Sequence, residues 1–285
     1  MRVGGITFGL ALLAIVSAMP EGTAAASDFW DEVKTPGLRE WRLYVREARV
    51  AVSAGQWRAA LGEADRAVAR LPDRAEAQVV RGRALGELGQ LEEAAAAFRR
   101  ALALDEAALD PAEDGTHAAR LCAAASEWEL ASRILPRVLG GMRINSQRHD
   151  LYALYGDVLL SLGPEHLREA VVAYREAVRQ GGRGHLRAVI GLALALRRRG
   201  DLLEASDLAR EVAGQGRIGG VIASLPVPSG EKAARRAIAL EANGDRTGSR
   251  TAWQEAATFE PWREHAERQL GAEEAPRERT RRRPR

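Results

Sequence analysis

The residues with the clearest potential for chemistry in this sequence are five histidines and one cysteine. No histidine lies four residues from another, which is the spacing at which one helix presents two ligands to zinc. The histidines are His117, His149, His166, His185 and His265. The cysteine, Cys122, lies between Leu121 and three alanines, a setting that favours a small buried hydrophobic side chain over a reactive thiol. We therefore predict no metal site and no thiol chemistry.

Other catalytic signatures are also missing from the sequence. It has no glycine-rich phosphate loop ending in Lys-Ser or Lys-Thr, and no Gly-x-Ser-x-Gly nucleophile turn. Aspartate and glutamate are abundant, but on helices they usually pair with arginine one turn away. The sequence predicts a non-enzymatic protein without catalytic residues and without a cofactor.

The net charge of +3 comes from the carboxyl end of the chain. Residues 272–285 contain six Arg and three Glu, which account for the whole excess. The remaining chain is neutral and lacks the broad basic surface that phosphate neutralisation requires, so we expect no nucleic-acid partner. All but two of the 42 Lys and Arg residues are arginine, the lysines being Lys34 and Lys232. A single arginine is therefore weak support for a site.

The amino terminus has the features of a secretory signal. Arg2 precedes an apolar stretch at residues 6–16, and Ala24–Ala26 provide small residues for cleavage. An uncleaved anchor is the alternative, but a bilayer span needs about 20 apolar residues and this stretch is shorter. No cysteine follows to accept a lipid. Residues 1–26 thus predict an exported protein, periplasmic or secreted.

Internal repetition indicates the elements that carry these side chains. Residues 41–74 and 75–108 align without a gap, and later segments keep the same skeleton. A turn residue recurs at Gly55, Gly89, Ser126, Gly163, Gly200 and Gly244. A small residue recurs seven places earlier, at Ala48, Gly82, Ala119, Gly156, Ala193 and Ala237. We predict six units, at 41–74, 75–108, 112–145, 149–184, 186–219 and 230–263.

The recurring small residues have a physical reason. Two antiparallel helices approach to roughly 8–10 Å only where small side chains occupy their crossing. One hairpin cannot bury both of its apolar faces, so successive hairpins must stack. The predicted fold is all-α, an α-solenoid of about six helix hairpins. Residues 27–40 are expected to form an amino-terminal cap, 264–271 a capping helix, and 272–285 a disordered arginine-rich tail.

The pattern resembles the tetratricopeptide repeat (TPR) family in its exported bacterial form. The family favours small residues at the crossing, a bulky residue late in the second helix and a proline at the end of the unit. The late bulky residue is present as Phe98, Tyr174 and Trp253, and the proline as Pro72 and Pro261. The resemblance extends from about residue 41 to residue 263.

The third unit departs most from the family pattern. Ser126 replaces its turn glycine, and Pro136 falls inside its second helix. Proline lacks an N–H and its ring clashes with the preceding turn, so we expect this helix to be kinked or shortened.

The resemblance implies a protein or peptide ligand on the concave side, which the first helices mainly form. The residue after each small crossing position is, in order, Arg49, Arg83, Arg120, Asp157, Leu194 and Ile238. The three arginines predict a ladder that grips carboxylates, and we take Arg49, Arg83, Arg120 and Asp157 as candidate protein-binding residues. The alternative is a solvated helix face in an arginine-rich chain. The family's Lys and Asn clamp for terminal carboxylates is not expected.

An insertion separates the fifth and sixth units. Residues 214–230 contain several Gly and Pro residues, which prevent simple continuation of a helix. Two interpretations remain open. The insertion is a loop packed on the solenoid by Val221, Ile222 and Leu225, or it folds into the groove and gates a site.

The predicted function is a protein–protein interaction scaffold of the bacterial cell envelope, binding a partner peptide or protein in its concave groove. The alternative is an envelope-assembly or cell-wall or membrane-associated module that acts through its basic tail. An enzyme whose site is not visible as a motif is the third and least supported class.

Overall fold

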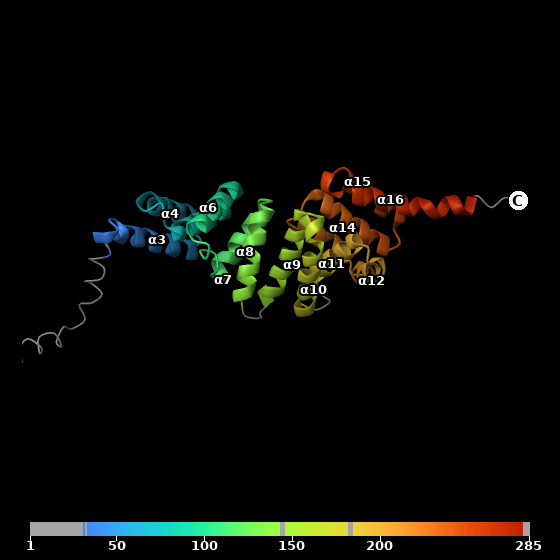
Figure 1. Cartoon of the computed structure of the whole chain (residues 1–285), viewed down its shortest axis with the longest axis horizontal. Coiled ribbons are helices and arrows are strands. Elements are labelled where there is room, and N and C mark those ends of the chain that lie inside the picture. Colours follow the sequence, from blue (N-terminus) through green and yellow to red (C-terminus); the bar gives the residue numbers. More distant parts are fainter. Residues whose placement is uncertain (1–30, 32, 143–145, 182–184, 282–285) are drawn as a thin grey trace, which may run out of the picture.

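A computed structural model describes residues 31, 33–142, 146–181 and 185–281 (Figure 1). The predicted signal peptide, and residues 27–30 and 32 of the predicted amino-terminal cap, lie outside the described residues. Within the described ranges the secondary structure is helical and contains no strand. None of the described helices combines the length and apolar character that a bilayer crossing requires.

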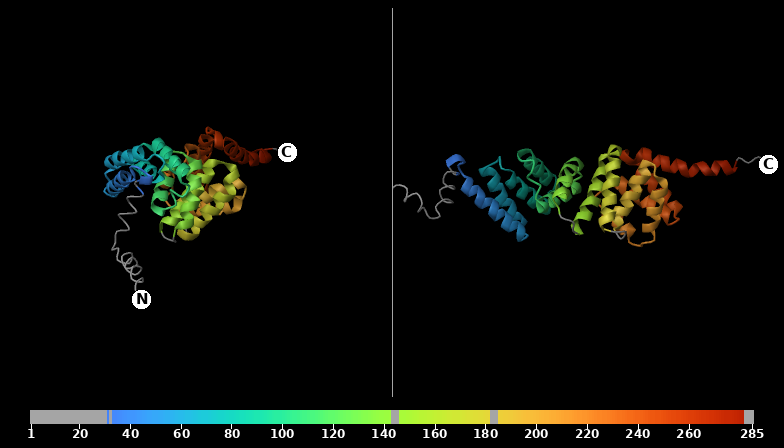
Figure 2. Two further views of the ribbon diagram at one scale, coloured as in Figure 1. Left: turned by 60° about the vertical axis from the view of Figure 1, so that its left-hand side comes forward. Right: turned by 60° about the horizontal axis from the view of Figure 1, so that its bottom comes forward.

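Six antiparallel helix hairpins stack in chain order, and Figure 2 shows the same stack from two further directions. The hairpins are α3 (Leu38–Ser53) with α4 (Trp57–Arg70), α5 (Ala75–Glu87) with α6 (Leu91–Leu104), α7 (Ala112–Ala124) with α8 (Trp128–Gly141), α9 (Ser146–Leu162) with α10 (Leu167–Gly181), α11 (Leu186–Arg199) with α12 (Leu202–Ala213), and α14 (Ser229–Ala242) with α15 (Arg246–Ala257). A short η1 (Pro164–His166), α13 (Ile218–Ser224) and α16 (Glu260–Arg281) complete the described elements. The predicted all-α solenoid is confirmed.

The small crossing residues lie in the core of the stack. The four alanines among them are fully buried. A Cβ added at Gly82 would lie 2.7 Å from Cε1 of Phe98, and one added at Gly156 would lie 2.6 Å from Cε1 of Tyr174. In the second and fourth units the bulky residue of the second helix therefore packs directly on the backbone of the first helix, and a larger crossing residue would not permit this contact.

The six recurring turn residues all have left-handed backbone conformations. Their φ angles are 69° for Gly55, 82° for Gly89, 60° for Ser126, 147° for Gly163, 101° for Gly200 and 82° for Gly244. Ser126 is the only described residue other than glycine with a positive φ. The turn demands this conformation, and the third unit meets the demand with a residue that carries a Cβ.

Replacing Ser126 with glycine is expected to raise the free energy of unfolding by about 0.5–1 kcal/mol. A left-handed backbone costs an L-residue roughly 1–2 kcal/mol, which the entropy of glycine in the unfolded chain offsets in part. The matched change Gly89→Ala should lower it by about 1 kcal/mol, since a Cβ there meets no atom within 4 Å and acts through the backbone alone. Urea midpoints of both variants test this. A lower midpoint for Ser126→Gly would contradict it.

Pro136 does not shorten its helix. Helix α8 has 14 residues, as do α4 and α6, so the expected shortening is wrong, while the alternative of a kink stays a prediction. Pro136 lies on the exposed side of α8, while its neighbours Leu135 and Val138 are fully buried. Proline cannot donate a backbone hydrogen bond, and apolar packing on the opposite side of α8 compensates for this loss and keeps the helix continuous.

The insertion contains a short helix, α13, where the sequence suggests only a loop. Ile218 and Ile222 of α13 are buried, as are Leu225 and Val227 after it. Helix α13 packs against α11 and α14, which are both first helices of their hairpins. We call residues 218–228 the strap, because they lie over the first-helix side of the stack.

The last helix is longer than the predicted capping helix. Helix α16 begins at Glu260 and continues through Arg281, so residues 272–281 are helical where the sequence suggests a tail without regular structure. Ala, Glu and Arg, which dominate this stretch, have high helix propensity. Trp262 and Ala266, near the start of the helix, pack into the core.

Candidate binding surface

The first helices meet one another through charged side chains on one side of the stack. Nε of Arg49, on α3, lies 3.0 Å from Oε1 of Glu76 on α5. Nη1 of the same arginine lies 3.4 Å from Oδ2 of Asp114 on α7. A side chain of the first hairpin reaches the third only where the stack curves inward. These residues therefore mark the inner face.

Arg83 repeats this arrangement one unit later. Its Nη1 lies 2.8 Å from Oε1 of Glu113 and 3.8 Å from Oδ1 of Asp114. The hydrogen bond from Arg83 and its charge hold the pKa of Glu113 below its usual value. Two of the three arginines predicted to form a ladder are thus already paired with carboxylates of this chain.

Arg120 is the exception. Its side chain is exposed, and within the described part of the chain it makes no hydrogen bond or ion pair. By its place in the repeat, its partner would be Asp150, because Asp150 occupies the position in the fourth unit that Glu76 and Glu113 occupy in the second and third. Asp150 instead accepts from Nε2 of His185 at 2.8 Å. The charge ladder is therefore interrupted between α7 and α9.

A hollow lies at this interruption. It has a volume of about 400 Å³ and is lined by Arg120, Asp150, Leu154, Arg187 and Pro226. A second hollow of about 290 Å³ shares Arg120 and is lined otherwise by residues of α7, among them His117, by Gly141 and Met142 at the end of α8, and by Gln147 of α9. We call the two together the Arg120 hollows.

A third hollow lies on the first hairpin. It measures about 400 Å³, and Trp41, Arg42, Val45, Arg46, Arg49, Val50, Ser53 and Glu76 line it. Val50 is 62% exposed there. Because Arg49 also marks the inner face, this apolar hollow and the Arg120 hollows open on the same side of the stack.

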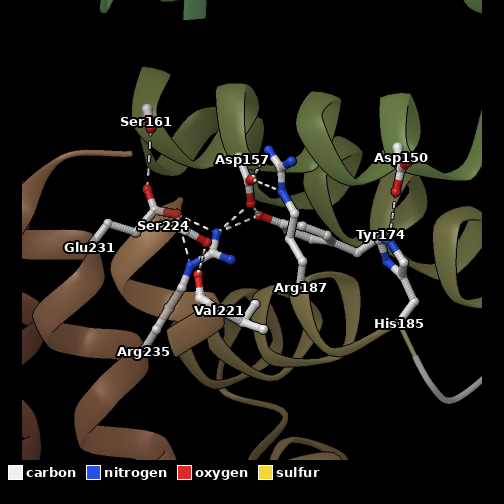
Figure 3. A network of polar contacts seen from close by, with 10 residues as sticks. All are labelled: Asp150, Asp157, Ser161, Tyr174, His185, Arg187, Val221, Ser224, Glu231 and Arg235. Atoms are coloured by element: carbon white, nitrogen blue, oxygen red, sulfur yellow. Dashed lines mark hydrogen bonds and ion pairs between the residues drawn. The ribbon is translucent and has the colours of Figure 1, made fainter. Parts of the chain in front are cut away.

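Asp157 does not belong to this surface. It is fully buried, where it accepts hydrogen bonds from Oη of Tyr174 at 2.6 Å, Nε of Arg187 at 2.7 Å and Nη2 of Arg235 at 2.5 Å. The residue after the crossing position is exposed in the third unit, but in the fourth it faces α11 and α14, which cover it (Figure 3). The prediction of Asp157 as a partner-binding residue is corrected accordingly.

A buried network extends from Asp157 to the sixth unit. Arg235 of α14 also donates from Nε to Oε1 of Glu231 at 3.1 Å, and Glu231 accepts from Oγ of Ser161 at 3.2 Å. Figure 3 shows Asp157 and Ser161 on one side of α9, facing Glu231 and Arg235 of α14. The network connects the fourth, fifth and sixth units through polar groups within the core.

The charges in this network differ in their surroundings. Burial acts to raise the pKa of Asp157, but Arg187 and Arg235 outweigh it and hold that pKa below the usual value. Burial raises the pKa of Glu231. The charge of Arg235 lowers it only in part, and the charge of Asp157 raises it further. Asp157 is therefore the carboxylate that the two guanidinium groups stabilise in its charged form.

The strap limits the inner face at its carboxyl end. Pro226 lines the larger Arg120 hollow together with side chains of α7, α9 and α11, all first helices. The insertion thus lies against the inner face, while Ile222 and Leu225 attach it to the core. The interpretation of a packed loop is supported by these buried residues, whereas the gating of a site stays a prediction.

Two histidines that the sequence leaves apart come together at the strap end of this surface. His149, Asp150 and His185 each offer a ligand atom, and these atoms lie within 4.8 Å of one another. The two histidines stand at nearly equivalent places in successive units. The spacing of histidines within one helix does not reveal this pair, whereas an alignment of the fourth unit with the fifth places the two histidines one position apart.

Cys122 is fully buried, and burial raises the pKa of its thiol to about 12. A thiol in this state is unreactive at neutral pH. The prediction of a small buried hydrophobic residue is confirmed.

Comparison with known proteins gives one family match. The model of the tetratricopeptide repeat matches residues 45–111 and 153–217. These segments contain hairpins with the left-handed turns and small crossing residues described above. No curated protein matches the chain in sequence.

Solved structures show similar folds at low identity. A mutant of MamA is 16% identical, covers 61% of this chain and 96% of its own, and has a TM-score of 0.51. The MSR-1 form of MamA is 15% identical, covers 61% of this chain and 95% of its own, and has a TM-score of 0.50. YrrB, described as a TPR protein with an unusual peptide-binding site, is 19% identical with 74% and 97% coverage and a TM-score of 0.43. The two MamA structures support the solenoid fold.

Proposed function

Because the chain is a tetratricopeptide-repeat protein, we propose that its inner face binds a partner peptide or protein at the Arg120 hollows. Proteins of this repeat family are non-catalytic scaffolds for protein–protein interaction, so the chain is a scaffold rather than an enzyme.

The interruption of the charge ladder carries the proposal. Arg49 and Arg83 have their charges balanced by Glu76, Glu113 and Asp114, so a partner gains little from them. Arg120 has an exposed guanidinium without a partner in the described chain, at the edge of two hollows. A guanidinium in this position favours a bidentate carboxylate. The partner therefore presents an acidic group to Arg120.

The walls of the larger hollow define the rest of the partner. Leu154 and Pro226 provide apolar contact beside Arg120, so an acidic residue next to an apolar one fits the site. The apolar hollow on α3 lies on the same inner face and extends the surface toward the amino-terminal end. The strap sets its other limit at Pro226. We place the partner between these two points as an extended acidic and apolar segment.

Replacing Arg120 with glutamate is expected to weaken partner binding by at least about tenfold, since it removes a charge-assisted hydrogen bond and adds a like charge. The control is Arg133→Glu, because Arg133 is an exposed arginine of the same unit that lies on the second helix α8. A photo-crosslinking residue placed at position 117, which lines the smaller Arg120 hollow, and in parallel at 133, identifies the partner while Arg120 is kept, and the affinity of this partner for each variant is then measured. Equal affinity of the Glu variants would contradict the proposal.

We also propose that the scaffold works outside the cytoplasm, in the bacterial envelope. The support is the signal-like composition of residues 1–26, with its positive start, apolar stretch and small residues before Ser27. Expression with its own amino terminus should give a periplasmic protein that begins at or near residue 27. Mass spectrometry of the fractionated protein checks this, and an uncleaved chain in the cytosol would contradict it. Contact of the basic tail with cell wall or membrane stays a prediction.

A further inference from the structure

His149, Asp150 and His185 form a group with the composition and spacing of a metal site. His149 and Asp150 lie in the first turn of α9, and His185 is the residue before α11. Nε2 of His149 lies 3.3 Å from Oδ1 of Asp150, and Nε2 of His185 lies 2.8 Å from the same oxygen. The two imidazole rings are edge-to-face with centroids 4.7 Å apart. Three donor atoms thus converge from two units.

These separations suit a small divalent cation. Zinc binds histidine nitrogen and carboxylate oxygen at about 2.0–2.2 Å, so neighbouring ligand atoms around a tetrahedral ion lie about 3.4 Å apart. The 3.3 Å between Nε2 of His149 and Oδ1 of Asp150 matches this value. The 2.8 Å between Nε2 of His185 and the same oxygen increases with a small side-chain rotation. The three ligand atoms lie within 4.8 Å of one another, a range that side-chain rotation can close around an ion.

The surroundings leave these residues available as ligands. Asp150 makes no ion pair with Arg120, although the repeat would place them together, and it receives both histidines on one oxygen. The side chains of His149 and His185 are only 20% and 18% exposed, whereas Asp150 is 47% exposed and borders the larger Arg120 hollow. Two imidazoles and one carboxylate are ligands that suit zinc and related late transition metals.

We propose that His149, Asp150 and His185 bind one divalent transition-metal cation, with zinc as the ion that fits best. The ion joins the start of α9 to the start of α11 and so connects the fourth unit to the fifth from the edge of the inner face. Three protein ligands leave one coordination position open, and Asp150 places that position next to the hollow. The inference does not rest on the proposed partner binding, since Arg120 is not a ligand, but the two sites are adjacent because Asp150 lines the larger Arg120 hollow.

The test is calorimetric titration of ZnCl₂ into the full chain, purified without a polyhistidine tag and stripped with a chelator. We expect one Zn²⁺ per chain. His149→Ala, His185→Ala and Asp150→Asn should each weaken Zn²⁺ binding by about 100-fold or more. Mutation of a residue that only hydrogen-bonds to a metal ligand already lowers metal affinity by about 10–100-fold. The control is His166→Ala, since His166 also lies near carboxylates, those of Glu165 and Glu169, and is 37% exposed. This variant should bind as the parent does.

A second readout identifies the ligands. Co²⁺ in a tetrahedral nitrogen and oxygen site gives intense visible absorption bands, which should appear in the parent and in His166→Ala and be lost in His149→Ala. Because His185 precedes α11, His185→Gln is measured beside His185→Ala, and circular dichroism confirms their helicity. Absence of saturable binding, or equal binding by the parent, His149→Ala and Asp150→Asn, would overturn the proposal.

Discussion

Replacing Arg235 with methionine is expected to lower the free energy of unfolding by about 3–5 kcal/mol, the usual cost of removing one partner from a buried ionic group. Arg235 is fully buried and bonds to both Asp157 and Glu231, which are also fully buried. Without it Asp157 keeps Arg187, but Glu231 retains only the hydroxyl of Ser161. Glu231 is then a buried carboxylate that has lost its guanidinium partner.

Two further variants separate this effect from simple loss of an arginine. Arg236→Met removes the next residue, which is 47% exposed and pairs with the similarly exposed Glu255, and it should cost less than about 1 kcal/mol. Arg235→Met combined with Glu231→Gln removes the charge left behind and should recover most of the loss. Urea unfolding followed by circular dichroism gives the values. Equal losses for Arg235→Met and Arg236→Met would refute the structural role of the network.

Acidification from pH 7 to pH 5 is expected to remove about 2 kcal/mol of stability through His265 alone. Burial lowers the pKa of His265 from 6.5 to about 3, and the charges of Arg198, Arg268 and Arg197 contribute. The unfolded chain then binds a proton below pH 6.5 that the folded chain does not take up until about pH 3. Stability is therefore full above pH 6.5 and is lost progressively as the pH falls toward 3.

The surroundings of His265 explain why it cannot take up this proton. Its ring packs edge-on against Trp253 and Trp262, at centroid distances of 5.6 Å and 6.3 Å, and it is 4% exposed. His265→Gln, which cannot titrate, should flatten the dependence of unfolding free energy on pH between 7 and 5. His166→Gln, at an exposed site, is the matched control for the substitution itself. Urea unfolding at several pH values decides this, and a parental slope in His265→Gln would show that other groups control acid stability.

The repeat architecture could be predicted from the sequence because it depends on local backbone demands. Each turn needs a left-handed residue, and each crossing needs a small one, so both recur at fixed positions whatever the rest of the unit contains. Ser126 meets the same demand and was recognisable by its position alone. The expected shortening at Pro136 was wrong because buried apolar residues on the other side of α8, such as Leu135 and Val138, keep the helix continuous.

The candidate site could be predicted only in part. The repeat position of Arg120 predicts a place on the inner face, and the structure shows its side chain exposed beside two hollows, while its role in binding stays a prediction. Asp157 has the same place in the repeat, but its surroundings depend on Arg235, which lies 78 residues further along the chain. The pairing of Arg49 and Arg83 likewise depends on acidic residues of later units. Contacts between units depend on the curvature of the stack, and the sequence of a single unit does not specify that curvature.

The uneven distribution of buried groups along the stack has a consequence for ligand binding. The fourth to sixth units share the largest apolar cluster and the buried charge network, whereas α3 and α4 contribute mainly to two small clusters. In a repeat protein each unit is stabilised only by its neighbours, so cooperativity weakens toward the amino-terminal end. The proposed partner covers that end. Its binding and the local folding of the first units are therefore thermodynamically linked, and the partner acts in effect as an additional repeat.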